Sequence, residues 1–221
     1  MKSDNIVLVD ICGTLYNSNT TFDFLDFYVK NKSYLFFRKC SRLFVWKVLN
    51  KFSLVTFKFD LTRAIAIKYL RNKTKEDLSS AADLFYEKVL INLKYTEVTS
   101  LLDKLKSDGM RLVLVSATID FIAKKVSQEM GISEIYSTEL VYQNDVCMGK
   151  IQCDLLANKL KYLKLENILP PYNLTITDNF SDIDLLKNSS NQIIISKNIN
   201  IKRWQSLIGI NKMLNFIIVT V

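Results

Sequence analysis

The chain has 221 residues and a net charge of +8, with 49% hydrophobic and 24% charged residues. This composition excludes a disordered, collagenous or low-complexity protein, and it fits one large domain or a core with an inserted subdomain. Because the sequence contains no histidine, histidine-based catalytic triads, histidine-ligated metals and histidine pH switches are also excluded.

The first predicted element is a buried parallel strand at residues 6–10, an apolar and β-branched run that stops at Asp10. From residue 20 to residue 95 the apolar residues recur at helical spacing, and Thr74 followed by Asp77 predicts a capped helix start. We expect this helical stretch to be an insertion above the carboxyl ends of the strands, where ligands of such sheets bind.

After residue 96 the predicted helices and strands alternate, which indicates an α/β fold with a parallel sheet and right-handed crossovers. An apolar tail at 204–221 is interrupted by polar residues, so we expect it to pack on the core as a helix or edge strand, with a membrane anchor as the alternative. The predicted helices are 97–110, 120–131, 155–165 and 182–189, and the strands are 111–118, 173–178 and 192–196, with an antiparallel excursion over 140–153.

The excess positive charge lies in the helical insertion. Residues 17–95 hold 15 basic and 7 acidic side chains, whereas the rest of the chain holds 15 of each. Residues 28–58 contain eight Lys or Arg, no acidic residue and many aromatics. Such a segment can rest on an anionic membrane surface or attract an anionic substrate. The alternative is a helical subdomain with its own small aromatic core and solvated lysines. We expect no nucleic acid partner, because no nucleic-acid-recognition motif accompanies the charge.

Three predicted strand ends place Asp10, Ser116 and Asp178 on one rim of the sheet. Two carboxylates there can hold Mg²⁺, which takes hard oxygen ligands and bridges to phosphate. A serine hydroxyl and a lysine ammonium supply donors for phosphoryl oxygens as their charge redistributes. The arrangement predicts phosphoryl transfer. Each residue alone also has a plainer interpretation, as a helix cap, a turn hydroxyl or a solvated side chain.

Four motifs occur in a fixed order: DxxGTL at 10–15, LVSAT at 114–118, a helical lysine at 159 and TDNFSDIDLL at 177–186. Together they resemble the haloacid dehalogenase superfamily, and within it the phosphoserine phosphatase-like branch. The resemblance implies a Rossmann-like α/β core over residues 1–15 and 96–221 and an α-helical cap over 16–95. It also implies Mg²⁺ dependence, an aspartyl-phosphate intermediate and a small phosphorylated substrate.

The same resemblance implies roles for the residues that meet the phosphate. Asp10 would be the nucleophile, and Ser116 would bind the phosphoryl group through its hydroxyl. Lys159 would neutralise the phosphoryl group and the nucleophile; Lys161, two residues on, would point elsewhere on a helix. The backbone amides of Gly13 and Ala117 would also face the phosphate.

For the metal, the resemblance implies that Asp10, Asp178 and the main-chain carbonyl of Cys12 would ligate Mg²⁺. Asp182, one helical turn after Asp178, would hold the water shell of the metal. Asp184 falls where the family often has a turn residue, so we interpret it as a surface charge.

The first motif departs from the family pattern at its third position. The phosphatase branches have DxDGT, in which the second aspartate protonates the leaving group and then activates water, and here Cys12 replaces it. A thiol with a pKa near 8.5 is a poor base at neutral pH. Thr177 and Asn179 stand where the family usually has glycine and serine, and they are milder departures that also suggest a relaxed site.

Three functions therefore stay open. The protein can be a phosphatase that is slow or restricted to good leaving groups, or a phosphotransferase with another acceptor than water. It can also be a catalytically weakened homologue that binds a phosphorylated ligand or a protein partner. A halide-releasing dehalogenase is disfavoured, because the metal-site aspartates are all present and that reaction needs no metal. The sequence indicates no oligomeric state.

The cysteines and the first residues predict a location. Because the cysteines show neither a CxxC pair nor zinc-site spacing, we expect reduced thiols. The short apolar run after the polar start is not typical of a secretory signal. We therefore expect a cytoplasmic protein, with peripheral membrane contact as the alternative. The cysteines are Cys12, Cys40, Cys147 and Cys153.

Overall fold

The computed structural model describes residues 5–196, 200–208 and 215–218. Within these residues a seven-stranded sheet has the order β4-β3-β2-β1-β5-β6-β7. All neighbouring strands are parallel except β3 and β4, which form the antiparallel excursion predicted from the sequence. The strands are β1 (Ile6–Val9), β2 (Arg111–Ile119), β3 (Ile135–Gln143), β4 (Val146–Cys153), β5 (Tyr172–Thr177), β6 (Ser189–Ser196) and β7 (Asn215–Ile218).

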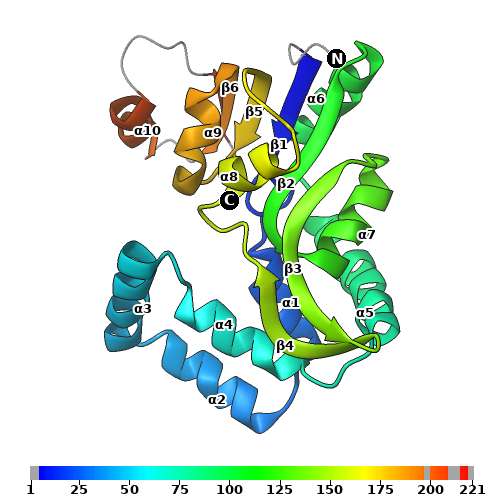
Figure 1. Cartoon of the computed structure of the whole chain (residues 1–221), viewed down its shortest axis with the longest axis vertical. Coiled ribbons are helices and arrows are strands. Elements are labelled where there is room, and N and C mark those ends of the chain that lie inside the picture. The colour runs from blue at the N-terminus through cyan, green and yellow to red at the C-terminus, as the bar shows by residue number, and fades with distance from the viewer. Residues whose placement is uncertain (1–4, 197–199, 209–214, 219–221) are drawn as a thin grey trace.

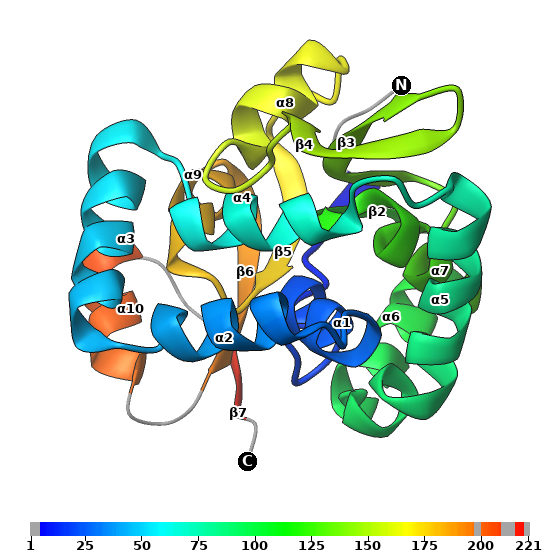
Figure 2. The same cartoon turned by 90° about the horizontal axis from the view of Figure 1, so that it is seen from below.

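The chain between β1 and β2 is helical, as expected. Figures 1 and 2 show α1 to α4 grouped beyond the carboxyl ends of the strands, whereas α5 and α6 lie on the side of the sheet that α7 also covers. The predicted capping box of Thr74 and Asp77 starts α5. The elements are α1 (Thr20–Tyr28), α2 (Lys32–Ser41), α3 (Phe44–Phe57), α4 (Leu61–Ile67), η2 (Lys68–Leu70), α5 (Lys75–Lys88), η3 (Leu90–Leu93) and α6 (Thr96–Ser107).

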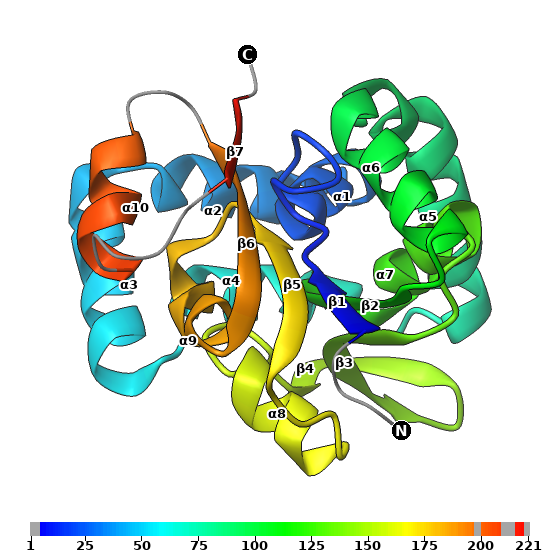
Figure 3. The same ribbon diagram turned by 90° about the horizontal axis from the view of Figure 1, so that it is seen from above.

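Helices cover both faces of the sheet (Figure 3). In β1 the side chains alternate, so that Val7 and Val9 join the core shared with α5, α6 and α7, while Ile6 and Leu8 join the core under α8 and α9. This two-sided burial explains why the strand reads as a continuous apolar run. The helices after β2 are α7 (Asp120–Met130), α8 (Lys159–Leu165), η4 (Phe180–Asp182), α9 (Ile183–Lys187) and α10 (Ile201–Ile208).

Some element bounds differ from the prediction. Helix α8 begins at Lys159 instead of residue 155, because Ala157 has a φ of 57° and interrupts the helix. Strands β3 and β6 begin earlier than predicted. Their first residues include polar side chains and lack the apolar run from which a strand is predicted. The tail forms α10 and the edge strand β7, as expected; residues 209–214 and 219–221 of that tail, like residues 1–4 of the predicted core, lie outside the described residues. Among the described residues, no helix has the length and apolar character that crossing a bilayer requires.

Candidate active site

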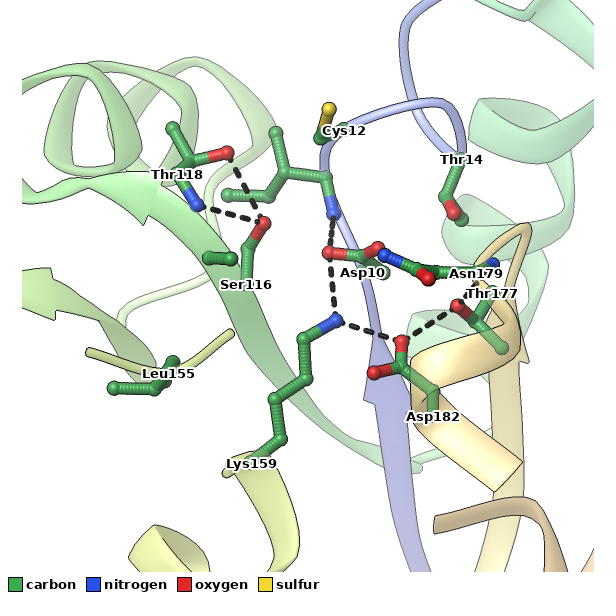
Figure 4. A network of polar contacts seen from close by, with 12 residues as sticks. Asp10, Cys12, Thr14, Ser116, Thr118, Leu155, Lys159, Thr177, Asn179 and Asp182 are labelled. Atoms are coloured by element: carbon green, nitrogen blue, oxygen red, sulfur yellow. Dashed lines mark hydrogen bonds and ion pairs between the residues drawn. The ribbon is translucent and has the colours of Figure 1, made fainter. Parts of the chain in front are cut away.

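A buried chain of charged side chains lies at the carboxyl ends of β1 and β5. Asp10 directly follows β1, and its Oδ1 accepts a hydrogen bond from the amide of Ile11 at 2.8 Å and an ion pair from Lys159 Nζ at 3.0 Å. The same Nζ lies 2.7 Å from Asp182 Oδ2. Figure 4 shows Lys159 reaching from α8 between the two carboxylates. Lys159, and not the exposed Lys161, therefore meets the predicted nucleophile.

Lys159 keeps its charge in this buried place. Burial alone lowers the pKa of an ammonium group, but the negative charges of Asp10 and Asp182 outweigh burial and raise the pKa of Lys159 above its usual value. The hydroxyl of Thr177 donates to Asp182 Oδ2 at 2.7 Å and fixes the orientation of that carboxylate. Lys159 is thus a fixed positive charge 3.0 Å from the Asp10 carboxylate.

Replacing Lys159 by Met is expected to lower the free energy of unfolding by about 3–5 kcal/mol, because Asp10 and Asp182 would stay buried without their cation. Urea unfolding followed by circular dichroism measures this loss. The matched control is Lys161→Met, on the same helix but exposed, which should change stability by less than about 0.5 kcal/mol. Equal stability of the two variants would contradict the ion pairs described here.

Asp178 directly follows β5 and lies beside the loop that follows Asp10. Thr14 Oγ1 donates to Asp178 Oδ1 at 3.2 Å and accepts from the amide of Asp178 at 3.0 Å, which joins the two loops. Burial and the negative charge of Asp10 raise the pKa of Asp178 to about 7. The negative charges of the two carboxylates therefore repel each other, and a nearby cation would stabilise the ionised form of both.

The donor set in this place fits a magnesium ion. Asp10 and Asp178 supply hard carboxylate oxygens, and Asp182 Oδ1 is buried without a hydrogen-bond partner. Mg²⁺ is commonly held by one or two carboxylates together with water and substrate phosphate. The described residues include no cluster of three or more acidic, cysteine or histidine side chains in metal-binding geometry. A site of two carboxylates, one main-chain carbonyl and water does not require such a cluster.

A small cavity of about 110 Å³ adjoins Asp10 and is also lined by Cys12, Ser116 and Ala117. Ser116 is fully buried in β2, and its Oγ lies 3.0 Å from Thr118 Oγ1 and accepts from the amide of Thr118 at 3.3 Å. The register of β2 against β3 shifts between Ser116 and Ile119, where the strand bends beside the cavity. The structure thus brings the residues predicted from β1 and β2 together on one cavity wall.

Gly13 differs from its prediction. Its amide donates to the carbonyls of Tyr16 and Ser18, at 3.0 and 3.2 Å, because the loop turns back on itself with a φ of 73° at this residue. The N–H is therefore not directed at a phosphate. Gly13 is required for a different reason: a Cβ atom here would lie 2.1 Å from Asp178 Oδ2. The glycine allows the first loop to approach the Asp178 carboxylate.

Comparison with known proteins identifies the family. The sequence model of the haloacid dehalogenase-like hydrolases matches residues 7–187. The chain belongs to this family. No curated protein matches the sequence, but the hydrolase is similar in structure to several solved proteins. A protein of unknown function from Bordetella pertussis Tohama I has a TM-score of 0.70 at 14% identity, over 96% of this chain and 97% of that one.

Two further similar structures are enzymes by their descriptions. A phosphoserine phosphatase with bound substrate has a TM-score of 0.58 at 18% identity, over 90% of each chain. Cytosolic 5′-nucleotidase IIIB with bound cytidine has a TM-score of 0.63 at 10% identity, over 98% of this chain and 81% of that one. At these identities the likeness establishes the fold, which is the Rossmann-like α/β fold of the haloacid dehalogenase superfamily with a phosphoserine phosphatase-like architecture.

Cys12 keeps its proton in this hydrolase. Its Sγ donates to the carbonyl of Ser18 at 3.1 Å. Burial, followed by the negative charges of Asp10 and Asp178, raises the pKa of Cys12 to about 12. The thiolate is therefore almost absent at neutral pH, and this side chain is a weaker acid and a rarer base than an ordinary cysteine. The replacement of the family's aspartate by Cys12 therefore removes more acid–base capacity than the ordinary pKa of a thiol predicts.

An arginine at the cavity was missed by sequence reasoning. Arg63 of α4 is 4% exposed and lines the cavity beside Asp10. Its Nη1 donates to Asp154 Oδ1 at 2.6 Å, and its Nη2 donates to the carbonyl of Ala117. These contacts join the helical insertion to the loop after β4 and to the strand β2 itself. Nothing in the sequence marks Arg63 among the many basic residues of the insertion.

The residues that depart from the family's usual fourth motif also have partners. The hydroxyl of Thr177 accepts a hydrogen bond from the amide of Asn179 at 3.0 Å and donates to Asp182. The side chain of Asn179 accepts from the amide of Ser181 at 2.9 Å and caps the turn η4. These substitutions therefore order the loop that carries Asp178 and Asp182. Asp184 lies exposed on α9, in keeping with a surface charge.

Proposed function

We propose that this hydrolase cleaves small phosphomonoesters through an aspartyl-phosphate formed on Asp10. The observation that carries the proposal is the buried contact of Lys159 with both Asp10 and Asp182 beside a small cavity, in a chain of a hydrolase family. A carboxylate oxygen of Asp10 bonds to phosphorus while the bond to the leaving oxygen breaks. Water then cleaves the acyl phosphate and restores the carboxylate.

The residues around Asp10 have matching roles in the proposal. The ammonium group of Lys159 lowers the repulsion between the carboxylate and an anionic phosphoryl group. The Ser116 hydroxyl and the Ala117 amide donate to the phosphoryl oxygens from the lining of the same cavity. The helices of residues 16–95 act as the cap that limits the substrate, over a core of 1–15 and 96–221.

The proposal includes a magnesium ion. Asp10, Asp178 and the main-chain carbonyl of Cys12 would hold it, and Asp182 would orient its water. When bound, Mg²⁺ would neutralise charge on the substrate phosphate. The high pKa of Asp178 supports this assignment, because a carboxylate so destabilised in its charged form gains most from a cation.

Cys12 limits the range of substrates. A leaving alkoxide needs a proton from a positioned acid, and a thiol with a pKa of about 12 supplies it poorly. Aryl, acyl and anomeric phosphates leave with little help from an acid, so we propose these as the better substrates. The same thiol supports the second candidate function, a weakened homologue that binds a phosphorylated ligand or a protein partner. We also propose a reducing, cytoplasmic location, because the cysteines show neither a CxxC pair nor zinc-site spacing.

The direct test is turnover of para-nitrophenyl phosphate by the purified protein with Mg²⁺. We expect turnover that a chelator abolishes and that added Mg²⁺ restores, because the aryl leaving group does not depend on Cys12. Isothermal titration of inorganic phosphate is measured in parallel. Phosphate binding without turnover, with magnesium binding confirmed, would replace the phosphatase proposal by the second candidate function.

A further inference from the structure

Helix α3 has its amphipathic pattern reversed. None of its 14 residues is buried, and the side chains that point toward the protein are largely polar or hydrogen-bonded. Trp46 Nε1 donates to Thr62 Oγ1 at 2.8 Å, and Asn50 Oδ1 accepts from the amide of Thr62 at 2.9 Å. These contacts, with the ring of Phe37 5.8 Å from the ring of Trp46, attach α3 to α2 and α4.

The outer side of α3 is a continuous apolar face. Its six members are spaced one, three or four residues apart, so they share one side of the helix. Figures 1 and 2 both show α3 at the outer edge of the molecule, away from the sheet. We call this set the α3 face; it consists of Phe44 (79% exposed), Val45 (69%), Val48 (49%), Leu49 (52%), Phe52 (62%) and Val55 (73%).

Further exposed apolar side chains precede the α3 face in the chain. Leu43, directly before α3, is 61% exposed, and Phe36 in α2 is 70% exposed. Scattered exposed apolar residues are ordinary on a protein surface, but a contiguous patch of large side chains marks an interaction site. The patch needs an occupant that accepts both apolar and cationic groups.

The α3 face belongs to a basic segment of the chain. The segment 28–58 contains no acidic residue, and seven of its eight basic side chains are exposed. Lys47 and Lys51 follow Phe44 by three and seven residues, and this helical spacing places them at the margin of the α3 face beside Phe44. The other exposed basic residues of the segment are Lys30, Lys32, Lys39, Arg42 and Lys58.

We propose that the α3 face binds the surface of an anionic lipid bilayer, with α3 lying in the plane of the interface. An apolar face bordered by lysines matches the acyl–headgroup boundary and the anionic headgroups above it. With 14 residues, the helix is about 21 Å long and shorter than the hydrocarbon core of about 30 Å, so it lies flat.

A second copy of the chain fits this surface less well. In a symmetric dimer the same face meets itself, so the lysines at its margin would approach their own equivalents with no acidic residue of the segment between them. An anionic surface neutralises these cations instead. The charge pattern therefore favours lipid over self-association.

Cosedimentation with vesicles tests the proposal on the full chain. The vesicles consist of phosphatidylcholine alone or of phosphatidylcholine with phosphatidylglycerol. We expect binding only to the anionic vesicles, and binding that weakens as salt rises. The double variant Phe44→Asp with Phe52→Asp should bind at least tenfold less. Lys47→Glu with Lys51→Glu should bind at least 25-fold less, since each lysine near the surface contributes about fivefold.

Matched controls separate the α3 face from general effects of charge. Ile91→Asp with Leu169→Asp places the same charges at similarly exposed sites, 51% and 53%, and Lys104→Glu with Lys150→Glu matches the lysine variant at exposed positions elsewhere. If the controls lose as much binding as the α3 variants, the proposal is overturned. It is also overturned if the protein binds no vesicle. In that case, a dimer that appears in sedimentation velocity and that Phe44→Asp with Phe52→Asp dissociates would assign the α3 face to self-association.

Discussion

Asp10→Asn is expected to abolish turnover of para-nitrophenyl phosphate, with a loss of at least about 10⁴-fold. The amide cannot attack phosphorus as a carboxylate does, and it also removes the negative charge that Lys159 faces at 3.0 Å. Steady-state assays measure the loss. Acid quenching during turnover of a radiolabelled phosphate donor should trap label on the wild-type protein and none on the variant.

The control for this loss is Asp184→Asn, which neutralises an exposed carboxylate on α9. It should retain turnover within about twofold of wild type. Circular dichroism shows whether Asp10→Asn is folded under the assay conditions. Turnover of a folded Asp10→Asn above one-hundredth of the wild-type rate would show that another group is the nucleophile.

Cys12→Asp is expected to raise turnover of an alkyl phosphomonoester by about 10²–10⁴-fold, the usual contribution of a positioned acid or base. The surroundings that raise the pKa of Cys12 to about 12 are burial and the charges of Asp10 and Asp178. They would raise the pKa of a carboxyl group in the same place toward neutrality, where it both gives and takes a proton. Turnover of an aryl phosphate should rise far less.

Cys12→Asn separates proton transfer from shape, because its side chain has the size of aspartate without the titration. It should leave alkyl phosphate turnover near the wild-type level. A rise of the same size in both variants would mean that Cys12 obstructs the cavity sterically. No rise in Cys12→Asp, with aryl turnover intact, would mean that the thiol suits the native reaction, such as transfer to an acceptor other than water.

Much of the sheet could be predicted because its signals are local. β1 is buried on both faces and reads as an apolar run, whereas β5 alternates apolar and polar residues. Each strand is followed by an aspartate that the topology brings to the same rim. The choice of Lys159 came from the order of the family motifs, and helical spacing set Lys161 apart from it. The predicted start of α8 was wrong, because nothing in the sequence indicates that Ala157 adopts a left-handed conformation.

The contacts that could not be predicted join distant segments. Arg63 meets Asp154 across 91 positions of sequence and Thr14 meets Asp178 across 164. No spacing rule connects residues so far apart. The amide of Gly13 was assigned to the phosphate from the family pattern, whereas the loop uses it internally. The sequence showed that the segment containing α3 is rich in aromatic and basic residues. Only the fold shows that the apolar side of α3 faces outward.

The large core cluster has a consequence for how the protein unfolds. The ring of Phe24 in α1 lies 5.6 Å from Phe85 in α5 and 5.0 Å from Phe121 in α7, so the helical insertion and the helices on the sheet share one apolar interior. Removing α1 would expose that interior, which makes unfolding cooperative across both parts. Among the described residues, helices α2 and α3 contribute one buried side chain to the cluster, Tyr34, and Phe37 of α2 packs against it partly buried. These two helices should therefore open locally at a lower free energy than the rest, and their amides should exchange hydrogen first.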